Sequence, residues 1–375
     1  MSKNIVYVSS PIGQQFGGGE QFIKNFIQTQ PQHNHVFIGS SKPMHKVFEE
    51  LKLQYFWQSG GLEPVIPLNI ILIPLSIVIG LINVFQQREL YKKADIIISP
   101  TSFTELFFVI PWLRLFFGKK ILFMIHNINC PKIFRLPIVR TIVKTFFQNS
   151  STVFVSKSQK EIWREYNILP KNNTVILNGV IISAFTPLKK DTSKVINIGY
   201  LGRIDKEKRL STLIQSLLNV KTKKQVVVNI GGAGPDEQHI KNLLNELTIP
   251  QNIKVVWHGF IKENKVPLFY EKNDLMIFPS SRESFGLSLV ESWERGVTVI
   301  TSDIPVLQEI QEIFLKEEQR LTFPLDDVKK LSDLINKAID NIEQYTSIEN
   351  QQFLHNQVEK NFSFKKIVEN YQQLF

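Results

Sequence analysis

The sequence predicts an α/β protein made of two Rossmann-like, doubly wound domains that face a cleft. Two observations predict this fold. Short apolar runs alternate with helical stretches along the 375 residues, which is typical of parallel sheets with right-handed crossovers. The alternation stops in a polar stretch at residues 187–194, and it restarts beyond that stretch. We therefore predict an N-terminal domain over residues 1–186 and a second domain over residues 187–355.

Each domain has its own series of expected strands. The first series is Ile5–Val8, Val36–Ile38, Ile96–Ser99, Ile121–Ile125, Thr152–Val155 and Val175–Leu177. The second series is Ile196–Tyr200, Val226–Ile230, Val255–Trp257, Leu275–Phe278 and Val297–Thr301. Open parallel sheets bind ligands beyond the carboxyl ends of their strands, so the loops that follow these strands are the candidate functional segments.

The composition indicates a globular cytoplasmic protein. Hydrophobic residues make up 43% of the chain and charged residues 21%, which excludes a disordered protein. The single cysteine, Cys130, allows no disulfide within the chain and indicates a reducing compartment. The first strand begins at the N-terminus with no signal peptide ahead of it, so we expect a cytoplasmic location.

The net charge of +10 fits nucleic acid, an anionic membrane or a phosphorylated small molecule. No helix is crowded with Lys and Arg and no ribonucleoprotein motif is present, so nucleic acid is the weakest of these partners. A basic surface that only maintains solubility stays open as well.

Two segments raise the question of a membrane. Residues Val65 to Phe85 are almost wholly apolar, but Pro67 and Pro74 interrupt them, so we predict a buried crossover helix rather than a span. Residues Phe103 to Lys120 combine aromatic and basic side chains. This second segment fits either a helix packed on the sheet or a peripheral contact with an anionic membrane.

The most informative stretch runs from Glu283 to Glu291, directly after the strand Leu275–Phe278. Ser284 is a plausible N-cap for a helix that continues to about Gly296. Free N–H groups at the start of a helix suit phosphate oxygens, and they are expected here at Phe285, Gly286 and Leu287. Glu291 would lie about two turns into the helix, so one carboxylate could reach a sugar while the other reaches a ribose.

Other loops after strands carry glycine or basic residues. Gly17–Glu20 precedes a helix expected at Gln21–Gln28, and glycine there permits close approach to a phosphate or sugar, although a bare turn fits equally. Arg203 and Lys208 follow the strand Ile196–Tyr200 and could grip a phosphate, whereas simple surface charge would explain either residue alone. Gly231–Pro235 lacks the dinucleotide-binding spacing and predicts a close-approach turn.

The remaining candidate residues follow two further strands. Gly259, Phe260 and Ile261 follow another strand and could form a wall for a nucleotide base. His126 follows the strand Ile121–Ile125, where it faces either the cleft and its substrate or the core. No cluster has the spacing of metal ligands.

Taken in order, these motifs resemble the retaining GT-B glycosyltransferases of family 4 over nearly the whole chain. The matching elements are Gly18 to Glu20, His126, Val155-Ser156, Val175 to Val180 with Phe185 and Pro187, Gly202-Arg203 with Lys208, Gly231–Pro235, Gly259, Pro279-Ser280, Glu283 to Glu291, and Gly296. The stretch from Phe362 to Lys365 resembles the last helix of the family, which returns to the first domain. The resemblance therefore implies a GT-B fold in which residues 356–375 join the N-terminal, acceptor-binding domain.

The resemblance implies transfer of a sugar from a UDP- or GDP-sugar, with retention at the anomeric carbon, no cofactor and no required metal. Glu283 and His126 are the implied catalytic residues, at the donor sugar and near the reacting centre. Glu291 would bind the ribose. The full set of implied donor-binding residues is Gly18, Gly19, Arg203, Lys208, Gly232, Phe260, Ile261, Ser284, Phe285, Gly286, Leu287 and Glu291.

The expected acceptor is a glycan or lipid-linked sugar, in surface polysaccharide or glycolipid synthesis, with the enzyme in the cytoplasm or peripheral at the inner face of the plasma membrane. Two alternatives stay open, a nucleotide-sugar 2-epimerase on the same fold and a non-catalytic sugar-nucleotide-binding scaffold. The chain departs from the family where Arg209 replaces a usual glycine, where Ser284 replaces a common glycine, and where Ser292 to Glu294 replace small residues. The last departure puts the packing of that helix in doubt.

Overall fold

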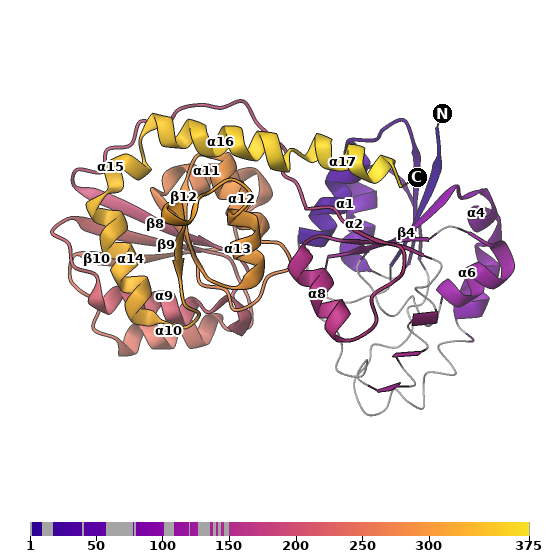
Figure 1. The fold of residues 1–375 in the computed structure, drawn as a ribbon, viewed down its shortest axis with the longest axis horizontal. Helices are drawn as coiled ribbons and strands as arrows, with labels where there is room; N and C mark the ends of the chain where they lie inside the picture. The colour runs from indigo at the N-terminus through magenta and orange to yellow at the C-terminus, as the bar shows by residue number, and fades with distance from the viewer. Residues whose placement is uncertain are drawn as a thin grey trace. The chain divides into compact units, whose positions relative to one another are not determined.

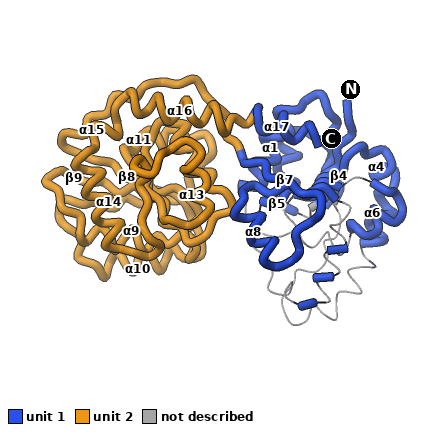
Figure 2. Tube along the Cα trace, viewed as in Figure 1, with its two compact units in different colours: residues 1–178, 365–375 blue, residues 179–364 orange. Residues whose placement is uncertain are grey.

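The computed structural model describes residues 2–9, 18–39, 41–57, 78, 80–100, 109–119, 121–126, 136–137, 140–141, 144–145 and 150–374. The chain divides into two compact units (Figure 2). Unit 1 comprises Met1–Asn178 and Lys365–Phe375, and unit 2 comprises Gly179–Phe364. The predicted first boundary, after residue 186, lies eight residues beyond the observed one after residue 178. The predicted second boundary, after residue 355, lies nine residues before the observed one after residue 364.

Unit 1 contains a seven-stranded parallel sheet in the order β3-β2-β1-β4-β5-β6-β7. Its strands are β1 (Asn4–Ser9), β2 (Asn34–Gly39), β3 (Gln54–Trp57), β4 (Ile96–Pro100), β5 (Ile121–Ile125), β6 (Ser151–Phe154) and β7 (Asn173–Val175). Helices with described bounds in or entering this unit are α1 (Gly18–Gln28), α2 (Lys42–Glu50), α4 (Arg88–Lys93), α6 (Ile110–Phe117), α8 (Lys157–Glu165) and α17 (Phe364–Gln372).

The C-terminal helix α17 completes the core of unit 1. Tyr371 is fully buried, and its ring lies 5.6 Å from that of Phe22 and 5.5 Å from that of Phe26, both in α1. Large aromatic side chains bury enough apolar surface to hold a terminal helix against a domain. This packing confirms that the C-terminal helix returns to the first unit.

Unit 2 contains a six-stranded parallel sheet in the order β10-β9-β8-β11-β12-β13. Its strands are β8 (Val195–Leu201), β9 (Gln225–Gly231), β10 (Ile253–Gly259), β11 (Leu275–Phe278), β12 (Thr298–Ser302) and β13 (Leu321–Phe323). Its α-helices are α9 (Leu210–Ser216), α10 (Glu237–Glu246), α11 (Val266–Lys272), α12 (Leu287–Glu294), α13 (Pro305–Gln311), α14 (Val328–Asp340), α15 (Ile342–Tyr345) and α16 (Ile348–Phe362).

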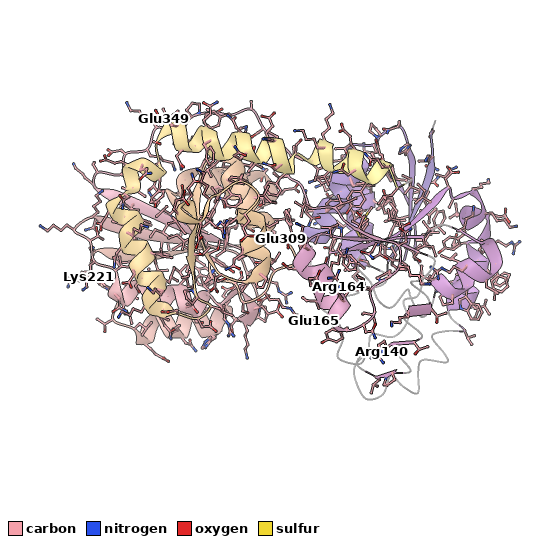
Figure 3. All side chains as sticks on the ribbon, viewed as in Figure 1. Arg140, Arg164, Glu165, Lys221, Glu309 and Glu349 are labelled. Atoms are coloured by element: carbon pink, nitrogen blue, oxygen red, sulfur yellow. The ribbon has the colours of Figure 1, made fainter. Side chains whose placement is uncertain are left out.

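The helices of unit 2 cover both faces of its sheet. Helices α9 and α10 lie on one side and α11, α12 and α16 on the other (Figure 1). Exposed charged side chains such as Lys221 and Glu349 project outward from this unit (Figure 3). The doubly wound α/β architecture predicted from the alternation of strands and helices is therefore confirmed.

The two chain segments that enter and leave unit 2 run side by side. Val180 and Ser363 form a parallel bridge. The N–H of Val180 donates to the carbonyl of Phe362, and the N–H of Phe364 donates to the carbonyl of Val180, both at 2.9 Å. The first and last residues of unit 2 thus meet at one point.

Most predicted strands agree with the structure to within two residues at each end. Strands β3 and β13, which are four and three residues long, were not among the predicted strands. The predicted helix over residues 65–85 lies mostly outside the described residues. In its described part, residues 80–85 are helical. Among the residues that the structure describes, no helix has the length and apolar character needed to cross a bilayer.

Helix α12 packs well despite the unusual Ser292 to Glu294. Trp293 is almost fully buried, and its ring lies 4.8 Å from that of Phe314. Phe314 in turn lies 6.4 Å from Phe362 and 6.1 Å from Phe353 in α16. Aromatic residues contributed by the neighbouring elements thus fill the space around the large side chain.

We expect Trp293→Ala to lower the free energy of unfolding by about 3–5 kcal/mol, since truncating a buried aromatic side chain leaves a cavity. Urea denaturation measures this change. Leu268→Ala is the matched control, because Leu268 is 60% exposed and its loss should cost less than about 0.5 kcal/mol. Equal effects of the two substitutions would contradict this description of the packing.

Candidate functional site

The candidate site in unit 2 lies at the carboxyl edge of its sheet. The chain proceeds from β8 to β9 and β10 in one direction and then continues with β11 on the other side of β8. This reversal makes the carboxyl ends of β8 and β11 a topological switch point, where open α/β sheets bind ligands. The loops that follow β8 and β11 carry the basic and acidic candidates.

Three loops at this edge are joined backbone to backbone. The N–H of Gly202 donates to the carbonyl of Gly231 at 3.1 Å, and the N–H of Gly232 donates to that of Gly259 at 2.7 Å. Gly232 has φ +134°, and a Cβ atom there would lie 1.8 Å from the carbonyl oxygen of Gly202. Only glycine fits this position. The predicted close-approach turn thus brings together the loops after β8, β9 and β10.

Helix α12 begins later than predicted. Its first residue is Leu287, and its N-cap is Gly286 with φ 94° and no side-chain capping bond, so the predicted N-cap at Ser284 is wrong. Only glycine tolerates this left-handed conformation readily. The N–H groups of Leu287 and Ser288 are the first two of the helix, and neither has a backbone acceptor among the described residues. The N–H groups of Phe285 and Gly286, the other two expected donors, likewise donate to no backbone carbonyl in the described part of the chain.

The residues before α12 are fixed by packing. A Cβ at Gly286 would come within 2.8 Å of Leu307 Cδ2. The side chain of Phe285 is buried, and its ring lies 6.0 Å from that of Phe362. Phe285 therefore anchors the turn that presents the helix N-terminus.

An ion pair joins the loops on the two sides of the switch point. Lys208 Nζ lies 2.6 Å from Glu283 Oε1, and the Ser280 hydroxyl donates to the same oxygen at 2.9 Å. Lys208 ends a short 3-10 helix, Lys206–Lys208, whose N-cap is Asp205. Both charged side chains of the pair are about one-fifth exposed, so they are held in place and still reach solvent.

The other two basic residues of the first loop have separate partners. Arg203 is exposed, and its Nε lies 3.4 Å from Asp205 Oδ2. Arg209 adopts the left-handed conformation, with φ 50°. Its Nε lies 3.3 Å from Asp326 Oδ1. This ion pair offsets part of the strain, which amounts to about 1–2 kcal/mol for a non-glycine residue.

Glu291 lies one turn into α12 rather than the predicted two. It is four residues after Leu287, or roughly 6 Å along the axis. Burial raises the pKa of its carboxyl, and a hydrogen bond from the Tyr270 hydroxyl to Oε2 at 2.7 Å opposes that rise. The carboxylate is therefore an oriented acceptor in a low-dielectric environment.

The predicted base wall has one exposed and one packed residue. Phe260 is 77% exposed, directly after Gly259 with its φ of 62°. Ile261 packs over Gly231, since a Cβ on that glycine would lie 3.0 Å from Ile261 Cγ1. Both residues lie at the same edge of the sheet as the glycine contacts.

The remaining candidates belong to unit 1. His126 follows β5, its ring lies 4.6 Å from that of Phe22, and neither ring nitrogen has a hydrogen-bond partner among the described residues. Burial lowers the pKa of His126 to about 4, so its imidazole is neutral at pH 7. Gly18 and Gly19 form the first turn of α1 instead of a loop ahead of it. Gly17 and Cys130 lie outside the described residues.

The structure thus brings together Lys208 and Glu283 in unit 2. Glu291 lies in α12, the helix that follows Glu283 in the chain. The structure also reveals residues that sequence reasoning missed. Asp205 had a signal, since aspartate commonly caps a helical turn. Tyr270 had none, because it lies 21 positions from Glu291 in the chain. Within the described part of the chain, no three His, Cys, Asp or Glu side chains cluster as a metal site requires.

Comparison with known families gives one match to a family model, "Glycosyl transferases group 1", over residues 184–353. Among curated relatives, the O-antigen biosynthesis glycosyltransferase WclY of Escherichia coli is 26% identical over 268 residues, covering 67% of this chain and 71% of the relative. The capsular polysaccharide biosynthesis glycosyltransferase CapM of Staphylococcus aureus is 28% identical over 172 residues, covering 42% and 44%. The alignment to the first curated relative found, an uncharacterized protein of Klebsiella pneumoniae, spans 55% of that relative's length.

Solved structures match over the full length of the chain. Anabaena Alr3699/HepE in complex with UDP has a TM-score of 0.75 at 14% identity, covering 100% of this chain and 99% of its own. Sucrose-phosphate synthase from Thermosynechococcus elongatus has a TM-score of 0.75 at 16% identity, covering 99% and 97%. At these identities the likeness shows the fold, which confirms the GT-B architecture.

We expect Gly232→Ala to destabilise unit 2 by about 2–5 kcal/mol, through the close contact with the Gly202 carbonyl and the positive φ. Gly259→Ala is the matched control, since Gly259 also has a positive φ but nothing lies within 4 Å of its Cβ position. The control should lose only about 1 kcal/mol. Urea unfolding compares the two, and an equal loss would refute the steric account.

Proposed function

We propose that this chain, whose residues 184–353 match the family model "Glycosyl transferases group 1", is a retaining glycosyltransferase. It moves a sugar from a UDP- or GDP-sugar to a glycan or lipid-linked acceptor. One observation carries this proposal: at the switch point of unit 2, a lysine–glutamate ion pair occurs beside a helix N-terminus with free N–H groups. The Anabaena structure in complex with UDP supports a nucleotide ligand for this fold.

In this proposal the donor's diphosphate binds at the start of α12. The N–H groups of Leu287 and Ser288 point along the positive end of the helix dipole. Lys208 adds a point charge, and Arg203 adds a planar guanidinium that can hold two phosphate oxygens. Negative charge grows on the leaving diphosphate as the glycosidic bond breaks, so these groups stabilise the transition state.

Glu283 is proposed to contact the donor sugar. It accepts hydrogen bonds from Lys208 and Ser280, which orient its carboxylate. Glu291 is proposed to bind the ribose, and Phe260 with Ile261 to border the base. The imidazole of His126 is proposed to hydrogen-bond the sugar or the acceptor. Its pKa of about 4 means that it would do so as a neutral group at pH 7.

For the retaining outcome we propose attack on the face from which the diphosphate leaves. The acceptor hydroxyl forms a bond to the anomeric carbon as the bond to the diphosphate breaks, and a leaving phosphate oxygen takes the hydroxyl proton. Lys208, Arg203 and the helix N-terminus supply the positive charge, so the proposal requires no metal. The anomeric configuration of the product, read by NMR, tests retention.

The acceptor is proposed to be a growing surface polysaccharide or a glycolipid, since WclY and CapM are named for O-antigen and capsular polysaccharide biosynthesis. A 2-epimerase would consume the nucleotide-sugar without an acceptor, and a scaffold would bind it without turnover. Product analysis with and without an acceptor distinguishes these outcomes from transfer.

We also propose that the protein works in the cytoplasm, peripherally at the inner face of the plasma membrane. Helix α6 buries Ile110 and Leu113 in unit 1, yet Leu115 is 70% and Phe116 46% exposed. The ring of Phe116 lies 5.0 Å from that of the exposed Phe85. Exposed basic residues of the neighbouring α4 are Arg88, Lys92 and Lys93. Apolar and cationic side chains together suit an anionic lipid surface.

A thermal-shift panel of UDP, GDP and their sugars tests the proposed function, since a true donor raises the melting temperature by mass action. We expect one nucleotide series to do so. Lys208→Ala should then weaken nucleoside diphosphate binding about 10–100-fold, because it removes a charged contact. The function is refuted if no nucleotide binds and no sugar is transferred.

Glu283→Gln should abolish transfer while binding the nucleoside diphosphate about fivefold more tightly than the wild type does. The substitution removes a negative charge near the diphosphate and releases Lys208 from its ion pair. Isothermal titration measures the affinity and a transfer assay measures the activity. Weaker binding by this variant would contradict the proposed position of the diphosphate.

Flotation with vesicles at low salt tests the membrane contact. We expect binding to vesicles that contain phosphatidylglycerol and loss of binding at high salt. Leu115→Ser combined with Phe116→Ser should abolish flotation, whereas Leu268→Ser combined with Ile348→Ser, at exposed positions of unit 2, should not. Wild-type protein that fails to float would end this proposal.

A further inference from the structure

A buried hydrogen bond links α11 to α12. Tyr270, in α11, is 1% exposed, and its hydroxyl donates to Glu291 Oε2 at 2.7 Å. The N–H of Ser288, three residues before Glu291 in the same helix, has no backbone acceptor among the described residues. A single phenol therefore connects α11 to α12 close to the N-terminus of α12.

This contact restricts the carboxylate of Glu291. An ionised carboxylate has two oxygens and about four acceptor positions. The Tyr270 hydroxyl occupies one position on Oε2, and the ring that carries it is packed in the core. This hydrogen bond restricts rotation of the carboxylate, and Oε1 accepts no hydrogen bond from the described residues, so it remains available to a ligand.

We propose that Tyr270 is a positioning residue that orients Glu291 toward the ribose hydroxyls of a nucleoside diphosphate. This inference rests on the proposed function, in which Glu291 binds the ribose. Tyr270 itself does not touch the ligand. Its effect should consequently be visible only for nucleotides that have ribose hydroxyls.

The charges around Glu291 set the sign of the pH effect. Burial raises the pKa of its carboxyl and Glu294 raises it further, whereas the Tyr270 hydroxyl and the charge of Arg295 lower it. Glu291 accepts hydrogen bonds best when ionised, so the preference for ribose over dideoxyribose should fall as the pH drops through its pKa. Loss of the Tyr270 hydroxyl should move that midpoint to higher pH.

The test measures the affinities of UDP and 2′,3′-dideoxy-UDP by titration from pH 5 to pH 8, with GDP and 2′,3′-dideoxy-GDP used if GDP is the nucleotide that binds. Taking the ratio of the two affinities at each pH cancels the titration of the phosphates. We expect Tyr270→Phe to weaken UDP about tenfold, by loss of a hydrogen bond to a charged group. It should weaken dideoxy-UDP less than twofold, and the midpoint of the ratio should rise.

Two further variants make the result specific. Tyr345→Phe removes a phenol hydroxyl elsewhere in unit 2, on α15, and should change neither affinity. Incorporation of 3-fluorotyrosine at position 270 keeps the ring and strengthens the donor, so the midpoint should fall. This variant also serves if Tyr270→Phe does not fold.

Equal weakening of both nucleotides by Tyr270→Phe, or a midpoint that moves with neither variant, would overturn the positioning role and leave the proposed function intact. Wild-type protein that binds neither UDP nor GDP would instead overturn the proposed function. In a Glu291→Gln background, Tyr270→Phe should add less than a twofold loss, because the two residues act as one unit. A full additional loss would overturn the inference as well.

Discussion

The backbone contacts at the carboxyl edge of the unit 2 sheet are the constraint on which the candidate site depends. Gly232 lies so close to the Gly202 carbonyl that no side chain fits between them. Hydrogen bonds across these loops hold the loop that carries Lys208, and the hydroxyl and N–H of Ser281 bind the carbonyl of Glu207 from the other side of the switch point. The ion pair of Lys208 with Glu283 therefore joins two loops that are already positioned by their main chains.

Helix α12 is held by packing in the same way, and this packing fixes the positions of both its N-terminus and Glu291. Phe285 packs just before its start, and Trp293 packs near its end. The buried carboxylate of Glu294 accepts hydrogen bonds from the N–H and the hydroxyl of Ser183. A buried charge is tolerated only where it is paired, and Arg295 Nε lies 2.7 Å from its second oxygen. The helix is thus held along its whole length.

Sequence patterns predicted the fold well because its strands are continuous apolar runs. The strand Leu275–Phe278 was predicted to the residue, and the GT-B likeness followed from motif order. The start of α12 was not, because Ser284 looks like an N-cap while the chain needs a left-handed residue, and only Gly286 supplies one. Tyr270 could not be found, since its contact with Glu291 exists only after α11 and α12 pack together.

The bridge between Val180 and Ser363 has a consequence for the history of such chains. Because the two ends of unit 2 lie side by side, unit 2 resembles a domain inserted into unit 1, whose last helix follows the insertion. Exchange of unit 2 would require two junctions that lie next to each other. A recombined chain would thus join a different unit 2 to its original unit 1, including the last helix, in one step.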